Sequence, residues 1–193
     1  MSKFFSWKNE KLAKVPLVLT FPHSGLFVPS KATWLKKHSK QTLLTDVDND
    51  VDFLYEKAIE KFTLPSLVNN VIRVVADLNR YPQDIDEASV EGAKDPQGTF
   101  PKGFYWQVTT LGEQLIKKPI SKKLHEYFVK EVHDAFHQEL QNKIVEIKRA
   151  FPNSPVYHLD CHSMPSEGTG LHLDRGEKRA DIVISDFKGK SSS

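Results

Sequence analysis

The sequence predicts an α/β fold with a mixed, largely parallel sheet flanked by helices. Two observations predict it. Short apolar runs alternate along the chain with longer segments in which apolar residues recur at helical spacing. Three of the apolar runs are also followed directly by clusters of polar side chains. In open α/β sheets, ligands bind at the carboxyl ends of the strands, so these clusters are candidates for a site.

Four segments are expected to be strands. Residues 16–21 form an apolar run that is closed by Pro22 and Gly25, which favour a turn. Residues 66–76 contain the β-branched run VIRVV, which is typical of a strand. The apolar runs at 155–160 and 180–185 have the same character.

Two segments are expected to be helical. From Val47 to Phe62 the apolar residues recur at helical spacing, and Thr45 or Asp46 is well placed as the N-cap. Residues 120–150 are charged and amphipathic, and predict one long helix or two. Residues 84–106 carry prolines and glycines and predict a long loop, which in a compact domain is usually functional or mobile.

Length and composition limit the class of protein. A chain of 193 residues with 39% hydrophobic residues suits one globular domain with a substantial core. The net charge of +2, with both signs interspersed, does not favour binding to nucleic acid or to an anionic membrane. Cys161 is the only cysteine, which excludes an intrachain disulfide. The polar N-terminus and the lack of a membrane-spanning apolar run favour a cytoplasmic enzyme.

His23 and His162 are the first candidates for metal ligands. Each follows the end of a predicted buried strand, which gives the side chain a rigid mount, and imidazole is the commonest zinc ligand. A single histidine in such a position is more often bonded to loop backbone. Two of them at equivalent strand ends, beside carboxylates, favour a metal site.

A carboxylate would complete a site of two histidines and one acid. The run TDVDNDVD at 45–52 offers four aspartates. In a helix, Asp48 and Asp52 would share the face turned toward the protein body, Asp50 would point away, and Asp46 would suit the N-cap. All four could instead complement the helix dipole. The run lacks the glycine and glutamate of an EF-hand loop.

Asn79 and Arg80 follow the second predicted strand. An arginine there can bind a substrate carboxylate through two hydrogen bonds, and the asparagine amide can add a third. Alternatively, Arg80 forms a surface salt bridge, which is an equally simple interpretation. Asp160 could orient His162 or cap the adjoining turn. Ser24 and Ser163 lack the surroundings of a serine nucleophile.

These residues also carry a resemblance to a known family. The pieces PHSG at 22–25, DLNR at 77–80, DCHSMP at 160–165 and DIV at 181–183, with the acidic stretch at 45–55, occur in this order. In this combination the chain resembles the N-formylglutamate amidohydrolases, from about residue 16 to its C-terminus.

The resemblance implies a fold related to the zinc carboxypeptidases and aspartoacylase, the phosphorylase/hydrolase-like fold. It implies one Zn²⁺ held by His23, His162 and an acid of the 46–52 cluster, for which Asp48 is preferred over Asp46 and Asp52. It also implies that Asn79 and Arg80 bind a substrate carboxylate. The expected reaction is hydrolysis of N-formyl-L-glutamate, a small N-acyl amino acid, to formate and glutamate in histidine breakdown.

Members of this family continue beyond the DIV piece. We therefore expect residues 1–193 to be a single amidohydrolase domain that lacks the family's C-terminal portion, with the general-base glutamate located beyond Ser193. Two other interpretations stay open. The chain could be a catalytically impaired fragment that only binds a small carboxylate or a partner, or a related zinc hydrolase with another amide substrate.

Overall fold

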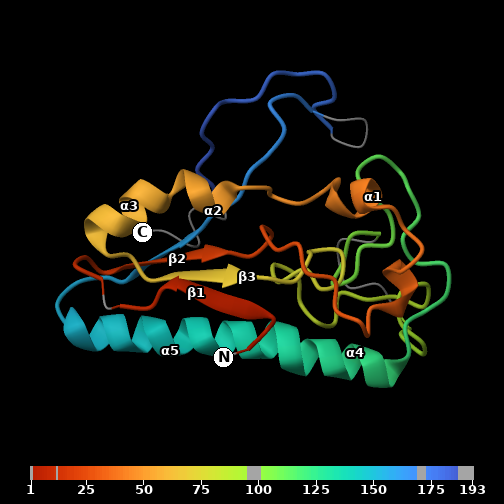
Figure 1. Cartoon of the computed structure of the whole chain (residues 1–193), viewed down its shortest axis with the longest axis horizontal. Helices are drawn as coiled ribbons and strands as arrows, with labels where there is room; N and C mark the ends of the chain where they lie inside the picture. The colour runs from red at the N-terminus through yellow and green to blue at the C-terminus, as the bar shows by residue number, and fades with distance from the viewer. Residues whose placement is uncertain (1, 12, 95–100, 169–172, 187–193) are drawn as a thin grey trace. The chain divides into compact units, whose positions relative to one another are not determined.

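The computed structural model describes residues 2–11, 13–94, 101–168 and 173–186. The chain forms two compact units, Met1–Ser163 and Met164–Ser193. The first unit contains the sheet and the helices described below (Figure 1). None of the described helices is long and apolar enough to span a membrane.

A four-stranded sheet forms the centre of the first unit. Its strands are β1 (Phe5–Asn9), β2 (Leu17–Phe21), β3 (Ser66–Asn69) and β4 (Tyr157–Asp160), in the order β1-β3-β2-β4. Strand β2 runs parallel to both β3 and β4, and β1 runs antiparallel to β3. The mixed, largely parallel sheet predicted from the sequence is confirmed.

Strand β1 was not predicted, because it is a short segment of five residues without a continuous apolar run. Phe5 packs edge-on against Phe136, with ring centroids 6.1 Å apart, and the indole of Trp7 donates a 3.4 Å hydrogen bond to Glu139. The alternation of apolar and polar residues from Phe5 to Asn9 is the period of a strand with one covered face, so the signal was present in the sequence.

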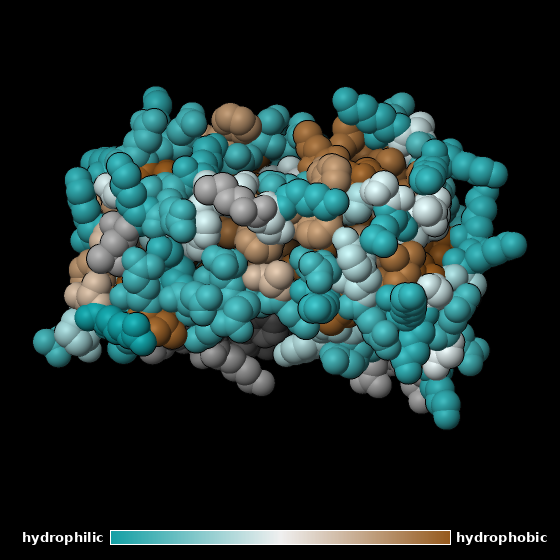
Figure 2. Space-filling model, turned by 60° about the horizontal axis from the view of Figure 1, so that its bottom comes forward, coloured by the Kyte–Doolittle hydropathy of each residue, from teal (hydrophilic) through white to brown (hydrophobic). Residues whose placement is uncertain are grey.

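One long helical segment covers one face of the sheet. It consists of α4 (Lys122–Phe128), the π-helical η2 (Val129–Asp134) and α5 (Ala135–Ala150), as expected for residues 120–150 (Figure 1). Its buried apolar residues recur mostly every four positions: Phe128, Val132, Phe136, Leu140 and Ile147. The surface seen from this side is mostly hydrophilic, with separate hydrophobic patches (Figure 2).

Shorter helices lie elsewhere in the first unit. Helices α2 (Val51–Leu54) and α3 (Glu56–Phe62) lie on the opposite face of the sheet, where Ile59 packs in a cluster with Leu19 and Phe21 (Figure 1). The 3-10 helix η1 (Thr33–Leu35) and helix α1 (Lys40–Leu44) precede them, and the Ser39 side chain caps α1 by accepting a hydrogen bond from the Thr42 backbone.

The predicted helix start near residue 45 is wrong. Helix α2 begins at Val51, after Asp50 in the left-handed backbone region with φ 60°. Asp46 does not cap a helix, because its carboxylate accepts hydrogen bonds from the backbone and hydroxyl of Thr110. Residues 45–50 are therefore a turn, which depends on contacts with distant residues.

Two strand predictions also need correction. Strand β3 ends at Asn69, whose side-chain amide donates to the carbonyls of Pro22 and Val71. The β-branched run at 71–75 is therefore no strand: Val71 forms an isolated bridge with Phe27, and residues 73–75 form a turn. In the second unit, residues 180–185 form no strand. Ile182, Val183 and Ile184 are exposed, and no backbone hydrogen bond joins the described residues of this run to another segment.

The described part of the second unit is held by a local ion pair. The Arg179 guanidinium binds the Asp174 carboxylate through two hydrogen bonds of 2.7 and 2.8 Å. Isolated bridges join Glu167 to Lys178 and Gly168 to Arg175.

Candidate metal centre

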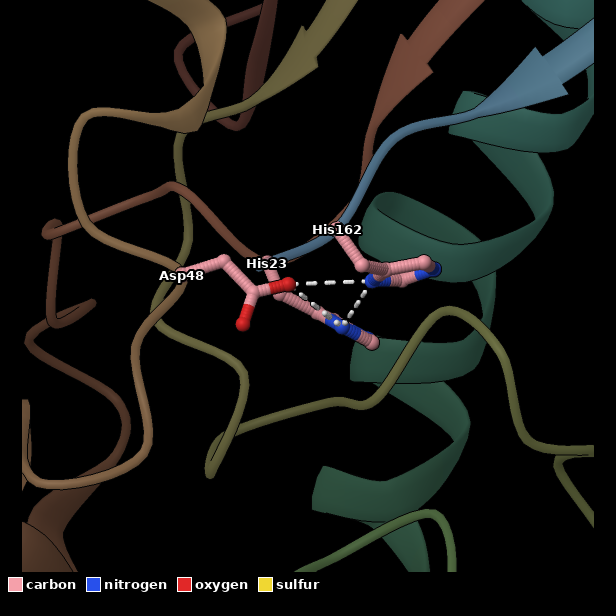
Figure 3. Close-up of side chains that lie close together, drawn as sticks. All are labelled: His23, Asp48 and His162. Atoms are coloured by element: carbon pink, nitrogen blue, oxygen red, sulfur yellow. Dashed lines mark hydrogen bonds and ion pairs between the residues drawn. The ribbon is translucent and has the colours of Figure 1, made fainter. Parts of the chain in front are cut away.

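Three predicted metal ligands meet at one edge of the sheet. His23 follows β2 by two residues and His162 follows β4 by two residues, and because these neighbouring strands are parallel, their carboxyl ends coincide. Asp48 comes from the 45–50 turn, where its backbone N–H donates a 3.0 Å hydrogen bond to the carbonyl of His23. The side chains converge although 139 residues separate the two histidines (Figure 3).

The three side chains present one ligand atom each. His23 Nδ1 and His162 Nδ1 are 3.2 Å apart, and Asp48 Oδ2 is 3.7 Å from the first and 3.0 Å from the second (Figure 3). His23 and Asp48 are buried, whereas the side chain of His162 is 37% exposed. The cluster is therefore buried at His23 and Asp48 and accessible to solvent at His162.

The outer nitrogens of both imidazoles are bound by carboxylates. His23 Nε2 lies 2.8 Å from Asp77 Oδ1, and His162 Nε2 lies 3.1 Å from Asp160 Oδ2. A carboxylate accepts hydrogen bonds, so Nε2 of His23 carries a proton and its Nδ1 is free to bind a metal ion. Both ring nitrogens of His162 face carboxylates, Asp48 at Nδ1 and Asp160 at Nε2, so a metal ion at Nδ1 would displace a proton that Asp48 now accepts.

Asp77 is completely buried and fully bonded. Besides His23, its carboxylate accepts hydrogen bonds from Arg73 Nη2 at 3.0 Å, from the Trp106 indole at 2.9 Å and from the Asn79 backbone at 3.0 Å. Burial alone would raise the pKa of Asp77, but His23 and Arg73 outweigh it and hold this pKa far below its ordinary value. Asp77 is thus a permanent negative charge behind His23.

Asp160 has a similar role behind His162, as the sequence suggested. Its carboxylate accepts a 2.6 Å hydrogen bond from the Thr20 hydroxyl and another of 2.6 Å from the Asn79 amide. Burial opposes the ionised form, yet the bonds to His162, Thr20 and Asn79 lower the pKa of Asp160. The turn-capping alternative is not needed to explain this residue.

The electrostatics of the cluster suit a cation. Although burial acts in the opposite direction, the two histidines and Arg73 hold the pKa of Asp48 well below its usual range. Burial would lower the pKa of His162, but Asp160 and Asp48 outweigh it and raise this pKa to about 9. The described cluster therefore attracts positive charge to His162 Nδ1, and a metal ion would replace that proton.

The donor chemistry fits zinc. His23, Asp48 and His162 form the one group of three or more histidine, cysteine or acidic residues in the described chain whose ligand atoms lie within 4.8 Å of one another. Two imidazoles and one carboxylate are a common ligand set of catalytic Zn²⁺, which keeps a further position for water or substrate. Carboxylates on the outer nitrogens of both histidines are typical of zinc sites as well.

The other aspartates of the 45–52 run lie outside this cluster. Asp46 is bonded to Thr110, Asp50 is exposed, and Asp52 forms a 3.1 Å salt bridge with Lys8. Asp48 was preferred on the assumption of a helix face, and this reason is wrong, because Asp48 precedes the helix. Its burial comes from the turn and from the hydrogen bond to His23.

Asn79 and Arg80 border the cluster from the segment after Asp77. The Asn79 amide lies 3.0 Å from His162 Nε2 and donates to Asp160. The guanidinium of the half-buried Arg80 binds the carbonyls of Lys102 and Asn79, and it forms no ion pair with a described carboxylate. The charge of Arg80 is thus available to an anionic ligand.

Arg73, Trp106 and Thr20 were not recognised from the sequence. The Arg73 guanidinium pairs with Asp77, lies 3.9 Å from Asp48 and stacks on Trp106 at 4.4 Å from the ring centroid. Arg73 was hidden inside an apparent strand. The spacing of four residues between Arg73 and Asp77 would indicate their contact only if a helical turn were expected there.

The comparisons with known proteins agree with this fold. The model of the FGase family, N-formylglutamate amidohydrolase, matches residues 15–193. A crystal structure of N-formylglutamate amidohydrolase from Ralstonia eutropha JMP134 has a TM-score of 0.81 and 26% identity, over 96% of this chain and 66% of that chain. No curated protein matches the sequence.

A second solved structure, of a gene product from Agrobacterium tumefaciens, has a TM-score of 0.67 and 17% identity, over 92% of this chain and 61% of that one. This likeness concerns the fold alone. The chain spans less than two thirds of the length of either protein. Because the family match extends over nearly the whole sequence, the chain belongs to the N-formylglutamate amidohydrolase family.

Proposed function

We propose that this protein is a zinc-dependent hydrolase that cleaves N-formyl-L-glutamate to formate and glutamate, a reaction of histidine breakdown. Family membership supports the class of reaction. The observation that carries the proposal is the convergence of His23, Asp48 and His162, with a carboxylate bound to the outer nitrogen of each imidazole.

In this proposal His23 Nδ1, His162 Nδ1 and an oxygen of Asp48 hold the metal ion. When bound, Zn²⁺ supplies a Lewis acid that polarises an amide carbonyl and lowers the pKa of a water molecule. Asp77 and Asp160 keep the two imidazoles in the tautomer and orientation that this ligation requires. The exposed side of His162 leaves room for the substrate to approach.

Arg80 binds a carboxylate of the substrate. Its guanidinium is available for a bidentate bond, since its contacts within the described chain are with backbone carbonyls. The Asn79 carbonyl binds Arg80 and the Asn79 amide lies 3.0 Å from His162, so we expect a substrate held by Arg80 to have its amide near the metal ligands. Such placement of the reacting groups is a large part of enzymatic rate enhancement.

A proton acceptor is also required. The carboxylates of the described cluster, Asp48, Asp77 and Asp160, are bonded to histidines and have lowered pKa values, so none of them is suited to hold a proton. We therefore keep the expectation from the resemblance that a glutamate outside the described site takes the proton and delivers it to the leaving amine.

Formate release from N-formyl-L-glutamate tests the proposal. We expect turnover with about one Zn²⁺ per chain, loss of turnover after chelation, and recovery on zinc addition. The His162→Ala variant should lose zinc and activity together, whereas Arg80→Met should keep zinc and have a higher KM. A zinc-loaded protein that binds N-formyl-L-glutamate without releasing formate would establish the alternative of a binding protein.

A further inference from the structure

A second cation that has no ion pair with a described residue lies close to Arg80. Arg80 Nε donates a 3.2 Å hydrogen bond to the backbone carbonyl of Lys102, which brings the two residues together although 22 positions separate them. The Lys102 ammonium has no hydrogen bond or ion pair with a described residue. These two charges therefore belong to one small region beside the metal centre.

The position of Lys102 is set by a tight local structure. Residues Lys102 and Trp106 face each other in an isolated antiparallel bridge, and the Lys102 ammonium lies 4.8 Å from the centroid of the Trp106 ring. The indole nitrogen of Trp106 is in turn bonded to Asp77, which binds His23. Lys102 is thus connected to a metal ligand through a short chain of buried contacts.

No described carboxylate forms an ion pair with Lys102. Asp46 attracts the Lys102 ammonium and acts to raise its pKa, but burial outweighs this attraction, and the Asp46 oxygens accept hydrogen bonds from Thr110 instead. Arg73 is the other cation on the Trp106 ring, and Asp77 and Asp48 already balance it. Partial burial lowers the pKa of Lys102, so a bound anion would relieve the cost of keeping this ammonium charged.

Two cations that lack carboxylate partners in the described part of the chain, beside one amidase centre, fit a ligand with two anionic groups. In an N-acyl glutamate the α-carboxylate is fewer bonds from the scissile amide than the side-chain carboxylate. The Arg80 guanidinium binds the carbonyl of Asn79, whose amide contacts His162, whereas the Lys102 ammonium lies on the ring of Trp106, whose indole binds Asp77. We assign the α-carboxylate to the cation that adjoins a direct contact of His162, and the side-chain carboxylate to the cation on the Trp106 ring.

We propose that Lys102 determines specificity for an acidic side chain, binding the side-chain carboxylate of the substrate while Arg80 binds its α-carboxylate. The inference rests on the proposed function, since it assumes that the amide bond lies at the metal centre. It assigns to residues 101–106 the role of distinguishing glutamate from glutamine derivatives.

Equilibrium binding to the zinc-loaded protein tests this without turnover. The ligands are L-glutamate, L-glutamine and L-isoglutamine; the two amides replace the side-chain and the α-carboxylate respectively. We expect Lys102→Met to weaken glutamate binding about 10- to 100-fold, the loss of one charge-assisted contact, and to leave glutamine binding unchanged. Arg80→Met should remove the preference for glutamate over isoglutamine instead.

Lys102→Arg should retain most of the glutamate preference because it keeps the charge. Lys118→Met is the matched control, because this substitution removes the same charge from an exposed lysine in another loop. If Lys102→Met keeps the wild-type ratio of glutamate to glutamine affinity, the inference is overturned. Formate release from N-formyl-L-glutamate by the wild-type protein is measured in parallel. If the wild type shows no zinc-dependent release, the proposed function fails. If it shows release and Lys102→Met keeps the wild-type affinity ratio, only the role of Lys102 fails.

Discussion

Replacing Asp77 by asparagine changes the charge behind His23 while the shape of the side chain is kept. Asp77 Oδ1 accepts hydrogen bonds from His23 and the Asn79 backbone, and Oδ2 accepts from Arg73 and Trp106. Asparagine has one acceptor oxygen and one donor nitrogen. In either orientation its NH₂ group must face two donors, so two of the four contacts become unfavourable.

The Asp77→Asn substitution should weaken zinc binding and lower the stability of the protein. Loss of the carboxylate partner of a metal-ligating histidine typically weakens metal affinity about 10- to 100-fold, so we expect the Zn²⁺ dissociation constant of Asp77→Asn to rise by that factor. Because Arg73 loses its fully buried partner, we also expect the free energy of unfolding of the metal-free protein to fall by about 3–5 kcal/mol.

Competition with a chromophoric chelator measures the zinc affinity, and chemical denaturation measures the stability. Asp134→Asn is the matched control, because Asp134 also lies 2.9 Å from a histidine, His133, but is exposed. That exposed pair should contribute at most about 1 kcal/mol and leave zinc binding unchanged. Wild-type zinc affinity in folded Asp77→Asn would refute the role given to Asp77.

Three further predictions concern protonation, backbone packing and substrate binding. In the metal-free protein, Asp160 and Asp48 outweigh burial and raise the pKa of His162 to about 9, so His162 carries an extra proton at pH 7.5. Zinc binding at that pH should release about one proton, and zinc affinity should increase as the pH rises toward 9. Calorimetry in buffers of different ionisation enthalpy measures the released proton. Gly25→Ala would place a Cβ against the backbone of Asn70, so we expect a loss of about 1–3 kcal/mol in stability, seen as a lower Tm. Arg80→Met should raise KM for N-formyl-L-glutamate about 10-fold or more without loss of bound zinc, and an unchanged KM would remove Arg80 from the substrate site.

The positions of the two candidate histidines could be predicted because local signals determine them. Apolar runs closed by proline, glycine or polar residues indicated the strands before His23 and His162. The parallel pairing of β2 with β4 then brings their ends together. The helix at 120–150 was predicted for a similar reason, since its buried residues follow helical spacing.

The surroundings of those histidines could not be predicted in the same way. The place of Asp48 depends on a backbone bond to His23, and the end of β3 depends on the Asn69 amide reaching Pro22. Arg73 lay in a β-branched run that is typical of a strand but forms a buried turn. These contacts join segments distant in sequence, and no residue propensity records them.

The position of a bound metal ion tests the central claim most directly. Crystals grown with zinc, measured on both sides of the zinc absorption edge, would locate the ion by its anomalous scattering. We predict a single strong peak about 2.0–2.2 Å from His23 Nδ1, His162 Nδ1 and an oxygen of Asp48. A peak bound to other residues, or none at this cluster under saturating zinc, would contradict the account.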